Sequence, residues 1–293
     1  MTRPAELWIP RAARRIPCDR PLIMGILNLN DDSFCGDGTL DYPVATDMVR
    51  SMLADGADII DVGAESARTN RAAISIDGEI ARLLPFITGF AALVAAADPP
   101  GDRQIWPPLL SINTWRPEVV DAVLPHAGDL LNDMGGLPDD RNARACARDG
   151  AALLIMHTVG EPKVPHTHCA WPDIRASLAS FFTEKIALAT AAGVNPRAIV
   201  LDPGIDFAKQ KPDNLRIFAH AGDLARHGCP VLLPISRRTM IGDVLDLENP
   251  LDRDAGTLAC LVAGMLRLPG PIFRVHNVAA AARAARVVHA SCR

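Results

Sequence analysis

The stretch DIIDVGAE at residues 58–65 is a short apolar run that ends in a carboxylate, Glu65. A strand of parallel sheet is apolar on both faces because helices cover both, so its packing does not require the terminal charge. Seven further runs have the same form and also end in polar residues: PLIMGILN (21–28), PLLSIN (108–113), DLLND (129–133), ALLIMH (152–157), AIVLD (198–202), PVLLPIS (230–236) and PIFRVH (271–276). Eight such runs predict eight strands whose carboxyl ends carry polar groups.

Segments of helical length separate these runs. They predict helices at 43–55, 76–97, 117–126, 140–149, 173–192, 213–227, 253–267 and 279–290. Eight alternating units predict an α/β fold, a (β/α)8 TIM barrel formed as a single domain, in which the carboxyl ends of the strands hold the active site. A doubly wound sheet is the competing topology, and eight similar units without a reversing break favour the closed barrel. Residues 1–18 fall outside the repeat and predict an N-terminal arm that packs loosely against a barrel of residues 19–293.

Composition excludes several classes of function. The chain has 293 residues, 49% of them apolar, and a net charge of −4, so it carries no basic surface for nucleic acid or an anionic membrane. No apolar stretch approaches the roughly 18 residues that span a bilayer. The seven cysteines are scattered without a CxxC pair, which favours reduced thiols. The basic N-terminus has no apolar signal core after it, so the cytoplasm is the expected location.

Two strand–helix loops stand out by composition. The loop at 30–38 is rich in Gly and Asp, and the loop at 65–71 carries two arginines. Mobile loops at the mouth of a barrel are candidate lids over a reactive intermediate. Loops of this composition also occur without any function.

The polar residues at the strand ends fall into two chemical groups. Asn132, Asp202 and Arg238 offer acceptors and a planar donor fork, which suit a flat heterocycle with amide and amidine edges. The second group offers hydrogen-bond donors and a possible metal ligand, which suit phosphate or pyrophosphate. Its members are Asn28, Arg68, Arg274 and His276. Any one of these residues, taken singly, is better explained as a satisfied polar group that closes a strand. As a set at equivalent positions they indicate a binding site.

The same runs carry a family resemblance. The stretches MGILNLNDDSF, GADIIDVGAES, SINT, LLNDMGG, LIMH, LDPGIDFAK, ISRRTMIG and RVHNV resemble, in order and spacing, those of the dihydropteroate synthase family. The resemblance covers residues 20 to 288. It implies a pterin-binding TIM barrel that condenses a dihydropterin hydroxymethyl pyrophosphate with para-aminobenzoate and releases pyrophosphate, in folate biosynthesis.

The resemblance also implies roles for individual residues. Pterin binding falls to Asn113, Asn132, Met156, Asp202, Phe207 and Arg238, and pyrophosphate binding to Asn28, Arg68, Arg274 and His276. The aminobenzoate pocket would be lined by Phe34, Ala67, Lys209 and Ser236. Asn113, Asp202, Arg238 and Arg68 would act in catalysis, with Mg2+ as the cofactor at Asn28. The family resemblance further implies a homodimer, for which the apolar segments 256–266 and 278–288 are candidates.

Several positions depart from the family pattern. Asn113 stands where the family has Asp, which removes a negative charge beside the pterin, and Arg238 replaces a lysine with a larger, planar cation. The remaining departures lie at the rims of the site: Asp31, Ala67, Thr69, Asn70, Asp206, Ala208, Pro234 and Asn277. They predict an altered acceptor pocket and weaker stabilisation of a pterin cation.

Three readings of function follow. The first is a synthase, with reduced activity or a different aniline as acceptor. The second is a pterin-binding paralogue without synthase activity, which Asn113 and Arg238 favour. The third is a pterin-dependent methyltransferase, against which the retained Arg274 and His276 count because such an enzyme has no use for a pyrophosphate site. A purely structural role is disfavoured by the polar residues gathered at one rim.

Overall fold

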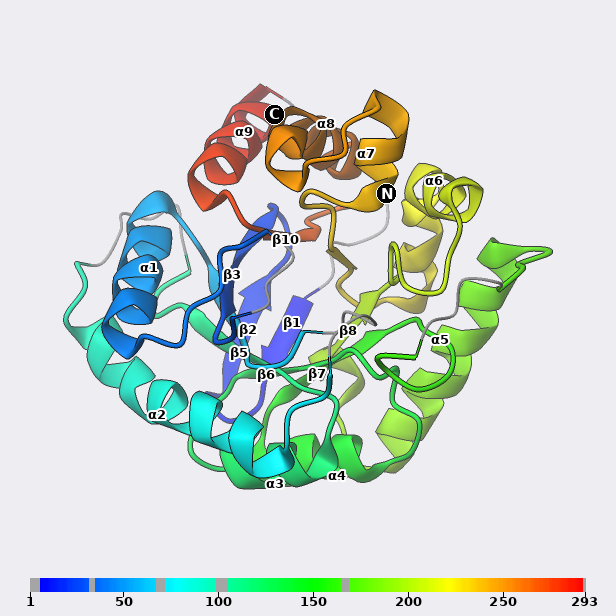
Figure 1. Cartoon of the computed structure of the whole chain (residues 1–293). Coiled ribbons are helices and arrows are strands. Elements are labelled where there is room, and N and C mark those ends of the chain that lie inside the picture. Colours follow the sequence, from blue (N-terminus) through cyan, green and yellow to red (C-terminus); the bar gives the residue numbers. More distant parts are fainter. Residues whose placement is uncertain (1–5, 32–34, 67–71, 99–104, 165–168, 292–293) are drawn as a thin grey trace.

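The protein is a barrel of eight parallel strands inside a ring of helices (Figure 1). A computed structural model describes residues 6–31, 35–66, 72–98, 105–164 and 169–291. The strands are β3 (Leu22–Asn28), β4 (Ile59–Gly63), β5 (Leu109–Asn113), β6 (Leu130–Asp133), β7 (Ala152–Met156), β8 (Ile199–Asp202), β9 (Leu232–Leu233) and β10 (Ile272–Val275). They pair in the order β8-β7-β6-β5-β4-β3-β10-β9, and a bridge between Leu201 and Val231 joins the two ends. The predicted TIM barrel is confirmed.

The helices alternate with the strands as predicted. They are α1 (Tyr42–Asp55), α2 (Ile76–Ala95), α3 (Pro117–Val123), α4 (Arg141–Asp149), α5 (Ile174–Ala191), α6 (Lys211–Ala219), α7 (Thr239–Leu245), α8 (Asp254–Met265) and α9 (Val278–Ser291). The helix expected at 213–227 is in fact α6 followed by a 3-10 segment, η2 (Ala221–His227). Two further short 3-10 segments are η1 (Pro196–Ala198) and η3 (Pro250–Arg253). Helix α7, which follows the ISRR stretch, had no counterpart among the expected helices.

The register of the strands decides which side chains point into the barrel. In parallel strands, directly paired residues face the same side and alternate residues share a face. Asn28 pairs with Gly63, Gly63 with Asn113, and Asn113 with Asn132. By the same rule Met156 and Asp202 share a face, and Arg274 shares one with Met24. The carboxyl ends of the strands therefore present one set of polar side chains inward.

The first residues that the structure describes, from Glu6 onward, form a hairpin that closes the other end of the barrel. Strand β1 (Glu6–Ile9) pairs antiparallel with β2 (Arg14–Pro17). The apolar side chains of the hairpin, Leu7, Ile9 and Ile16, are almost fully buried. Arg11 N donates to Gly150 O at 2.6 Å, and Arg14 donates to the carbonyl of Pro107 at 2.5 Å, both just before strands of the barrel. The expectation that the arm packs loosely is wrong, because these apolar side chains belong to the core.

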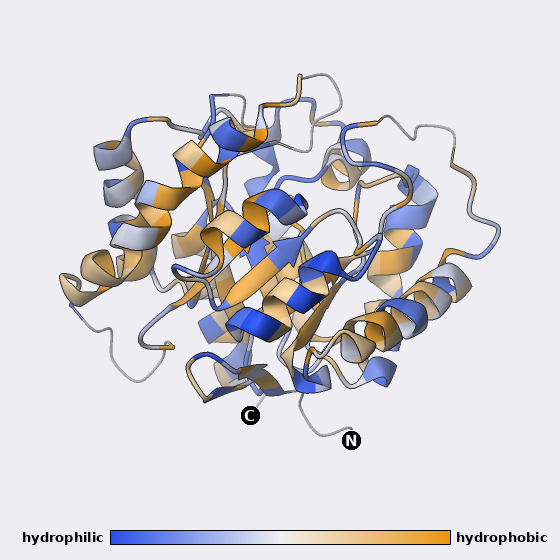
Figure 2. Ribbon diagram, turned by 90° about the horizontal axis from the view of Figure 1, so that it is seen from below, coloured by the Kyte–Doolittle hydropathy of each residue, from blue (hydrophilic) through white to orange (hydrophobic). Residues whose placement is uncertain are grey.

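Apolar residues gather in the strands and on the inner faces of the helices (Figure 2). By length and composition alone, α2 would be able to cross a membrane. Its Leu83, Phe86 and Ile87 are buried against the barrel, and its Glu79 is held in an ion pair with Arg116. Helix α2 is therefore a core helix of the barrel.

Candidate active site

The centre of the inner rim is organised by Asp61, a fully buried carboxylate on β4. Its two oxygens accept hydrogen bonds from the Ser111 hydroxyl at 2.5 Å and from the side-chain amides of Asn113 at 3.1 Å and Asn132 at 3.2 Å. Arg274 Nε donates to the same carboxylate at 2.8 Å. Buried charge is costly unless it is paired and hydrogen-bonded, and Asp61 is both.

Sequence reasoning missed Asp61, although the signal was present. A charged residue in the middle of an otherwise apolar strand is rare in a protein interior unless it has a partner. The stretch DIIDVGAE placed Asp61 two residues before Gly63, hence on the same face. Gly63 leaves room for Asn113, because a Cβ on it would lie 3.2 Å from the Cβ of Asn113, a tight contact. Asp61 and Gly63 together set the position of Asn113.

Two buried amide oxygens at this rim have no hydrogen-bond partner among the described residues. They are Oδ1 of Asn113 and Oδ1 of Asn132, whose amide nitrogens both donate to Asp61. A buried acceptor left without a partner costs roughly 1–3 kcal/mol. These oxygens are therefore positioned to accept N–H groups of a bound molecule.

Asp202, at the end of β8, is the second inward carboxylate. It is 5% exposed and accepts a hydrogen bond from Gly204 N at 2.7 Å. Burial raises the pKa of Asp202 to about 6, although the bond to Gly204 and the cations Arg238, Lys209 and Arg274 lower it. A ligand that brings N–H donors to this carboxylate would stabilise its charged form.

Arg238 and Phe207 form a platform beside Asp202. The guanidinium lies over the Phe207 ring, with Cζ 5.3 Å from the ring centroid, and its Nε donates to Pro234 O at 2.6 Å. Asp206 ties the Phe207 loop to the start of α7, because its side chain accepts from Thr239 N at 2.7 Å. Asp206 and Ala208, which replace family glycines, both have a positive φ, so the loop keeps the backbone conformation that glycine favours.

Lys209 contacts the backbone of Phe207 and of the end of β7, the strand that carries Met156. Lys209 is 8% exposed, and its Nζ donates to the carbonyls of His157 at 3.0 Å and Phe207 at 2.8 Å. Burial lowers the pKa of Lys209 to about 7. Lys209 therefore holds the Phe207 loop to the end of β7, where Met156 is almost fully buried on the inward face.

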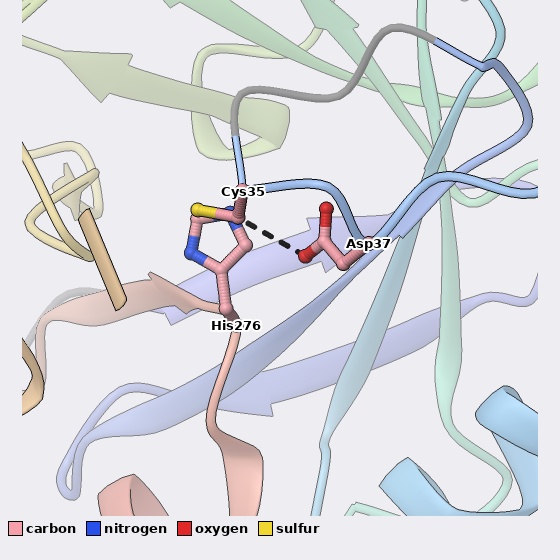
Figure 3. A group of neighbouring side chains, drawn as sticks. All are labelled: Cys35, Asp37 and His276. Atoms are coloured by element: carbon pink, nitrogen blue, oxygen red, sulfur yellow. Dashed lines mark ion pairs between the residues drawn. The ribbon is translucent and has the colours of Figure 1, made fainter. Parts of the chain in front are cut away.

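A second polar cluster lies at the junction of β3 and β10. Asn28 Nδ2 donates to Asp37 Oδ1 at 3.3 Å, and Asp37 Oδ2 lies 3.8 Å from His276 Nε2. The other ring nitrogen of His276 lies 2.8 Å from Ser236 Oγ. Figure 3 shows the side chain of Cys35 beside the His276 ring and Asp37. Burial lowers the pKa of His276 to about 4, so this ring is neutral at pH 7.

Arg237 borders this cluster, where it shares a side-chain hydrogen bond with Cys35, and it also forms an ion pair with Asp254. Its Nε and Nη2 donate to the two oxygens of Asp254 at 2.7 and 3.1 Å. Asn277, a departure from the family pattern, donates to the same carboxylate at 3.1 Å. The positive charge of Arg237 is thus largely neutralised by Asp254, next to the neutral His276.

Glu65, the residue that closes β4, anchors a buried ion network instead of facing the rim. It pairs with Arg116 and with Lys163, whose Nζ lies 3.3 Å from Glu65 Oε1. Arg116 also lies 3.2 Å from Glu79 on α2, and Lys163 donates to Ser66 O at 2.8 Å. Burial raises the pKa of Glu79. The network fixes the last described residues before 67–71.

Two strand-end residues point away from the inner rim. Asp133 is one residue beyond the inward Asn132 and accepts instead from Gly135 N and from Asn142 on α4. His157 packs among Trp171, Phe181 and Phe182, with ring centroids 4.8–6.4 Å apart. Both residues end apolar runs of the sequence, but alternation along the strand turns their side chains outward.

The remaining predicted site residues, Phe34, Ala67 and Arg68, lie outside the described residues. Of the two predicted lids, the structure describes residues 30, 31 and 35–38 of the first, and residues 65 and 66 of the second. The other expected groups are brought to one rim. Asp61, Asp37 and Cys35 join them as residues that sequence reasoning missed.

Comparison with known proteins places the chain in a family. The family model described as pterin binding enzyme matches residues 24–276, from the first strand of the barrel to His276. Dihydropteroate synthase of Escherichia coli K12 is 32% identical over 272 residues, which is 92% of each chain. The chain belongs to the dihydropteroate synthase family.

Solved structures of the dihydropteroate synthase family agree over nearly the whole length. The Yersinia pestis enzyme in complex with a sulfonamide drug superposes with a TM-score of 0.86 and 30% identity, covering 98% of this chain and 99% of that one. The Xanthomonas albilineans enzyme with 4-aminobenzoic acid gives a TM-score of 0.83 and 30% identity, covering 99% and 98%. The fold and family predicted from the sequence are confirmed.

Proposed function

We propose that this protein is a dihydropteroate synthase, which joins a dihydropterin hydroxymethyl pyrophosphate to para-aminobenzoate and releases pyrophosphate. The observation that carries the proposal is the inner rim itself. Asp202, Asn113 and Asn132 offer hydrogen-bond acceptors there, and Asn28 and His276 lie at the neighbouring strand ends. The first group suits the N–H edges of a pterin and the second suits a diphosphate.

The pterin is proposed to lie flat between the β8 loop and the strand ends. Asp202 accepts two N–H bonds from its amidine edge, and the free Oδ1 atoms of Asn113 and Asn132 accept from the ring nitrogens. The Arg238 and Phe207 platform covers one face, with Met156 at the ring edge. Asp61 places a buried negative charge behind Asn113, which offsets the charge lost with the family's Asp at that position.

Asn28, Arg274 and His276 are proposed to hold the diphosphate. Arg274 uses one of its N–H groups on Asp61, so its guanidinium is oriented while other N–H groups remain for phosphate oxygens. Asp37 lies next to Asn28, whose Nδ2 donates to its carboxylate. The carboxylate of Asp37 and the amide oxygen of Asn28 are both of the ligand type that Mg2+ prefers, so these residues fit the metal that the family implies. Mg2+ bound at Asn28 would neutralise charge on the departing pyrophosphate.

The condensation then needs little acid or base chemistry from the protein. The C–O bond to pyrophosphate breaks while the rim carboxylates stabilise positive charge on the pterin. The neutral aniline nitrogen attacks the exposed carbon and loses its proton afterwards. Lys209 and Ser236 border the aminobenzoate position in this proposal, together with Phe34 and Ala67 of the two loops, and Arg68 acts on the leaving group.

The test is pyrophosphate release by the purified chain with dihydropterin pyrophosphate and Mg2+, measured with and without para-aminobenzoate. Release that depends on the aniline is expected. In parallel, pterin binding is measured by calorimetry. Asp202→Asn should abolish both signals, because the amide presents N–H where the pterin also presents N–H.

Asp133→Asn is the matched control. Asp133 is buried on the outward face of β6, and burial raises the pKa of Asp133 to about 6, as for Asp202. The control should bind pterin and release pyrophosphate like the unaltered protein. Equal losses in both variants would contradict the assignment of Asp202.

The second reading, a pterin-binding paralogue without condensation, predicts binding without pyrophosphate release for any aniline. Arg238 is the departure that still favours it, since the guanidinium is committed to Phe207 and Pro234. A pterin-dependent methyltransferase would instead transfer a methyl group to a corrinoid partner. The pyrophosphate assay, extended by a methyl-transfer measurement, distinguishes the synthase, the pterin-binding paralogue and the methyltransferase.

We further propose a homodimer in the cytoplasm. Leu266 at the end of α8 and Val287 on α9 are large apolar side chains, 69% and 70% exposed, on adjacent helices of the segments named above. The described cysteines are free thiols, which agrees with a reducing compartment. Sedimentation of the purified chain tests the dimer, and Leu266→Glu should shift it toward monomer.

A further inference from the structure

Three side chains with soft and hard metal-ligand atoms meet beside the proposed diphosphate site. Cys35 Sγ, a carboxylate oxygen of Asp37 and a ring nitrogen of His276 all lie within 4.8 Å of one another (Figure 3). Cys35 and Asp37 come from the loop between β3 and α1, whereas His276 follows β10. All three are partly buried. This combination is not explained by diphosphate binding, for which a thiol has no use.

The orientation of His276 suits a metal ligand. Ser236 Oγ lies 2.8 Å from Nδ1 of the ring and also accepts the backbone N–H of His276 at 3.1 Å. When the Ser236 oxygen accepts from Nδ1–H, the ring takes the tautomer that has its lone pair on Nε2. That nitrogen is the one facing Asp37, at 3.8 Å. Metal-binding histidines are commonly held in this way by a hydrogen bond at the other ring nitrogen.

The surrounding charges also permit a cation. Arg237 and Arg274 lie near His276, but Asp254 neutralises the first and Asp61 the second. Arg238 donates away from the cluster, to Pro234 O. These three guanidiniums exceed the two carboxylates by one positive charge, which the carboxylate of Asp37 balances.

We propose that Cys35, Asp37 and His276 form a binding site for a thiophilic divalent cation, Zn2+ above all, with a fourth position open to water. Zn2+ binds thiolate sulfur at about 2.3 Å and imidazole nitrogen or carboxylate oxygen at about 2.0–2.2 Å, which places ligand atoms roughly 3.5 Å apart. The pair His276 and Asp37 is already within a few tenths of an ångström of that spacing. Metal binding releases the thiol proton of Cys35 to solvent.

The donor set separates this site from the proposed Mg2+ site. Magnesium takes oxygen ligands, whereas a thiolate with imidazole selects zinc and its neighbours in the transition series. Asp37 is common to both, so the two cations would share or compete for its carboxylate. The relation between the two cations rests on the proposed function, because that function supplies the Mg2+ site. The zinc site itself does not rest on the proposed function.

The experiment is a titration of the metal-free full-length protein with Co2+ alone, which replaces Zn2+ with the same ligands. A near-ultraviolet thiolate-to-cobalt charge-transfer band that saturates at one Co2+ per chain and vanishes on addition of Zn2+ is expected. Cys35→Ser should abolish the band. Asp37→Asn should weaken Co2+ binding at least 10-fold, and Ser236→Ala by 10- to 100-fold through the orientation of His276.

Cys260→Ser is the matched control, since Cys260 is another partly buried thiol, on α8, and this variant should keep the band. No band at one equivalent, or a band that survives in Cys35→Ser, would overturn the proposal. No pterin is present in this titration, so its outcome is separate from that of the pyrophosphate assay. Turnover without a cobalt band contradicts the zinc site alone, and a band without turnover contradicts the proposed function alone.

Discussion

Asn113 donates its side-chain amide to the fully buried carboxylate of Asp61, at 3.1 Å. The two residues stand on adjacent strands, and the bond leaves the amide oxygen of Asn113 without a partner among the described residues. An Asp at position 113 would meet the carboxylate of Asp61 without a proton between them. The amide at position 113 therefore supplies this buried carboxylate with a hydrogen-bond donor.

Asn113→Asp should make stability depend on pH. Two carboxylates at this distance cannot both ionise cheaply, so one of them takes a folded-state pKa above its value in the unfolded chain. The free energy of unfolding then falls as pH rises from the unfolded-state pKa through the folded-state pKa, by about 1–3 kcal/mol at pH 8. Urea unfolding at pH 5 and pH 8 measures this difference in the free energy of unfolding. Asn113→Ala removes the bond without adding charge, and its loss should be the same at both pH values relative to the unaltered protein.

Asp202→Asn should stabilise the protein while it abolishes pterin binding. The pKa of Asp202 is raised to about 6 by burial, above its usual value near 4, so the folded state holds a proton that the unfolded chain releases between those pH values. Stability falls as pH rises through that window. Removing the ionisation should raise the free energy of unfolding at pH 7 by about 1–3 kcal/mol.

The same pKa predicts that pterin affinity of the unaltered protein rises as pH increases through about 6, when the carboxylate forms. Calorimetry between pH 5 and 8 checks this. Asp133→Asn should give a similar gain in stability with the pH dependence of pterin binding unchanged. A flat affinity profile in the unaltered protein would count against Asp202 as the pterin acceptor.

Arg238→Lys should weaken pterin binding although it restores the family's residue. The guanidinium stacks on Phe207 and donates to Pro234 O, and a lysine ammonium cannot reproduce the planar contact. The loss of about 1–2 kcal/mol corresponds to roughly a 10-fold higher dissociation constant or KM. Steady-state kinetics with the pterin pyrophosphate as the varied substrate measures it. An unchanged KM would show that the platform does not contact the pterin.

Arg116→Met should strongly destabilise the fold. It leaves the buried carboxylates of Glu65 and Glu79 without their shared partner, and breaking a buried ion pair costs about 3–5 kcal/mol. Urea unfolding measures the loss. Arg141→Met breaks ion pairs between exposed side chains, 58% and 54% exposed for Arg141 and Glu118, and should have no measurable effect.

Much of the fold was accessible from the sequence because a TIM barrel repeats one unit. Each buried strand is a short apolar run, and a polar residue such as Asn28 or Asp202 marks its carboxyl end. The hairpin of residues 6–17 was not predicted, since two strands of four residues show little pattern and gain their burial only from the barrel. Helix α7 has seven residues and was missed for the same reason.

The candidate site was predicted only in part, because a single position along the chain does not fix the direction of a side chain. Asn132 and Asp133 are neighbours, and only the pairing register turns the first inward. Asp61 was overlooked because it lies within a run that was read as a strand and not at its end. Cys35 and Asp37 join His276 across more than 230 positions of sequence, a relationship that only closure of the barrel creates.

Because the hairpin of β1 and β2 closes one end of the barrel and the candidate active site lies at the other, substitutions at the two ends should have different effects. Substitutions of Leu7 or Ile16 should reduce the yield of folded protein, and each folded molecule should keep its kinetic constants. Substitutions of Asp202 should spare the yield and remove the activity. A selection that scores abundance and turnover separately would therefore sort random variants by the end of the barrel they strike.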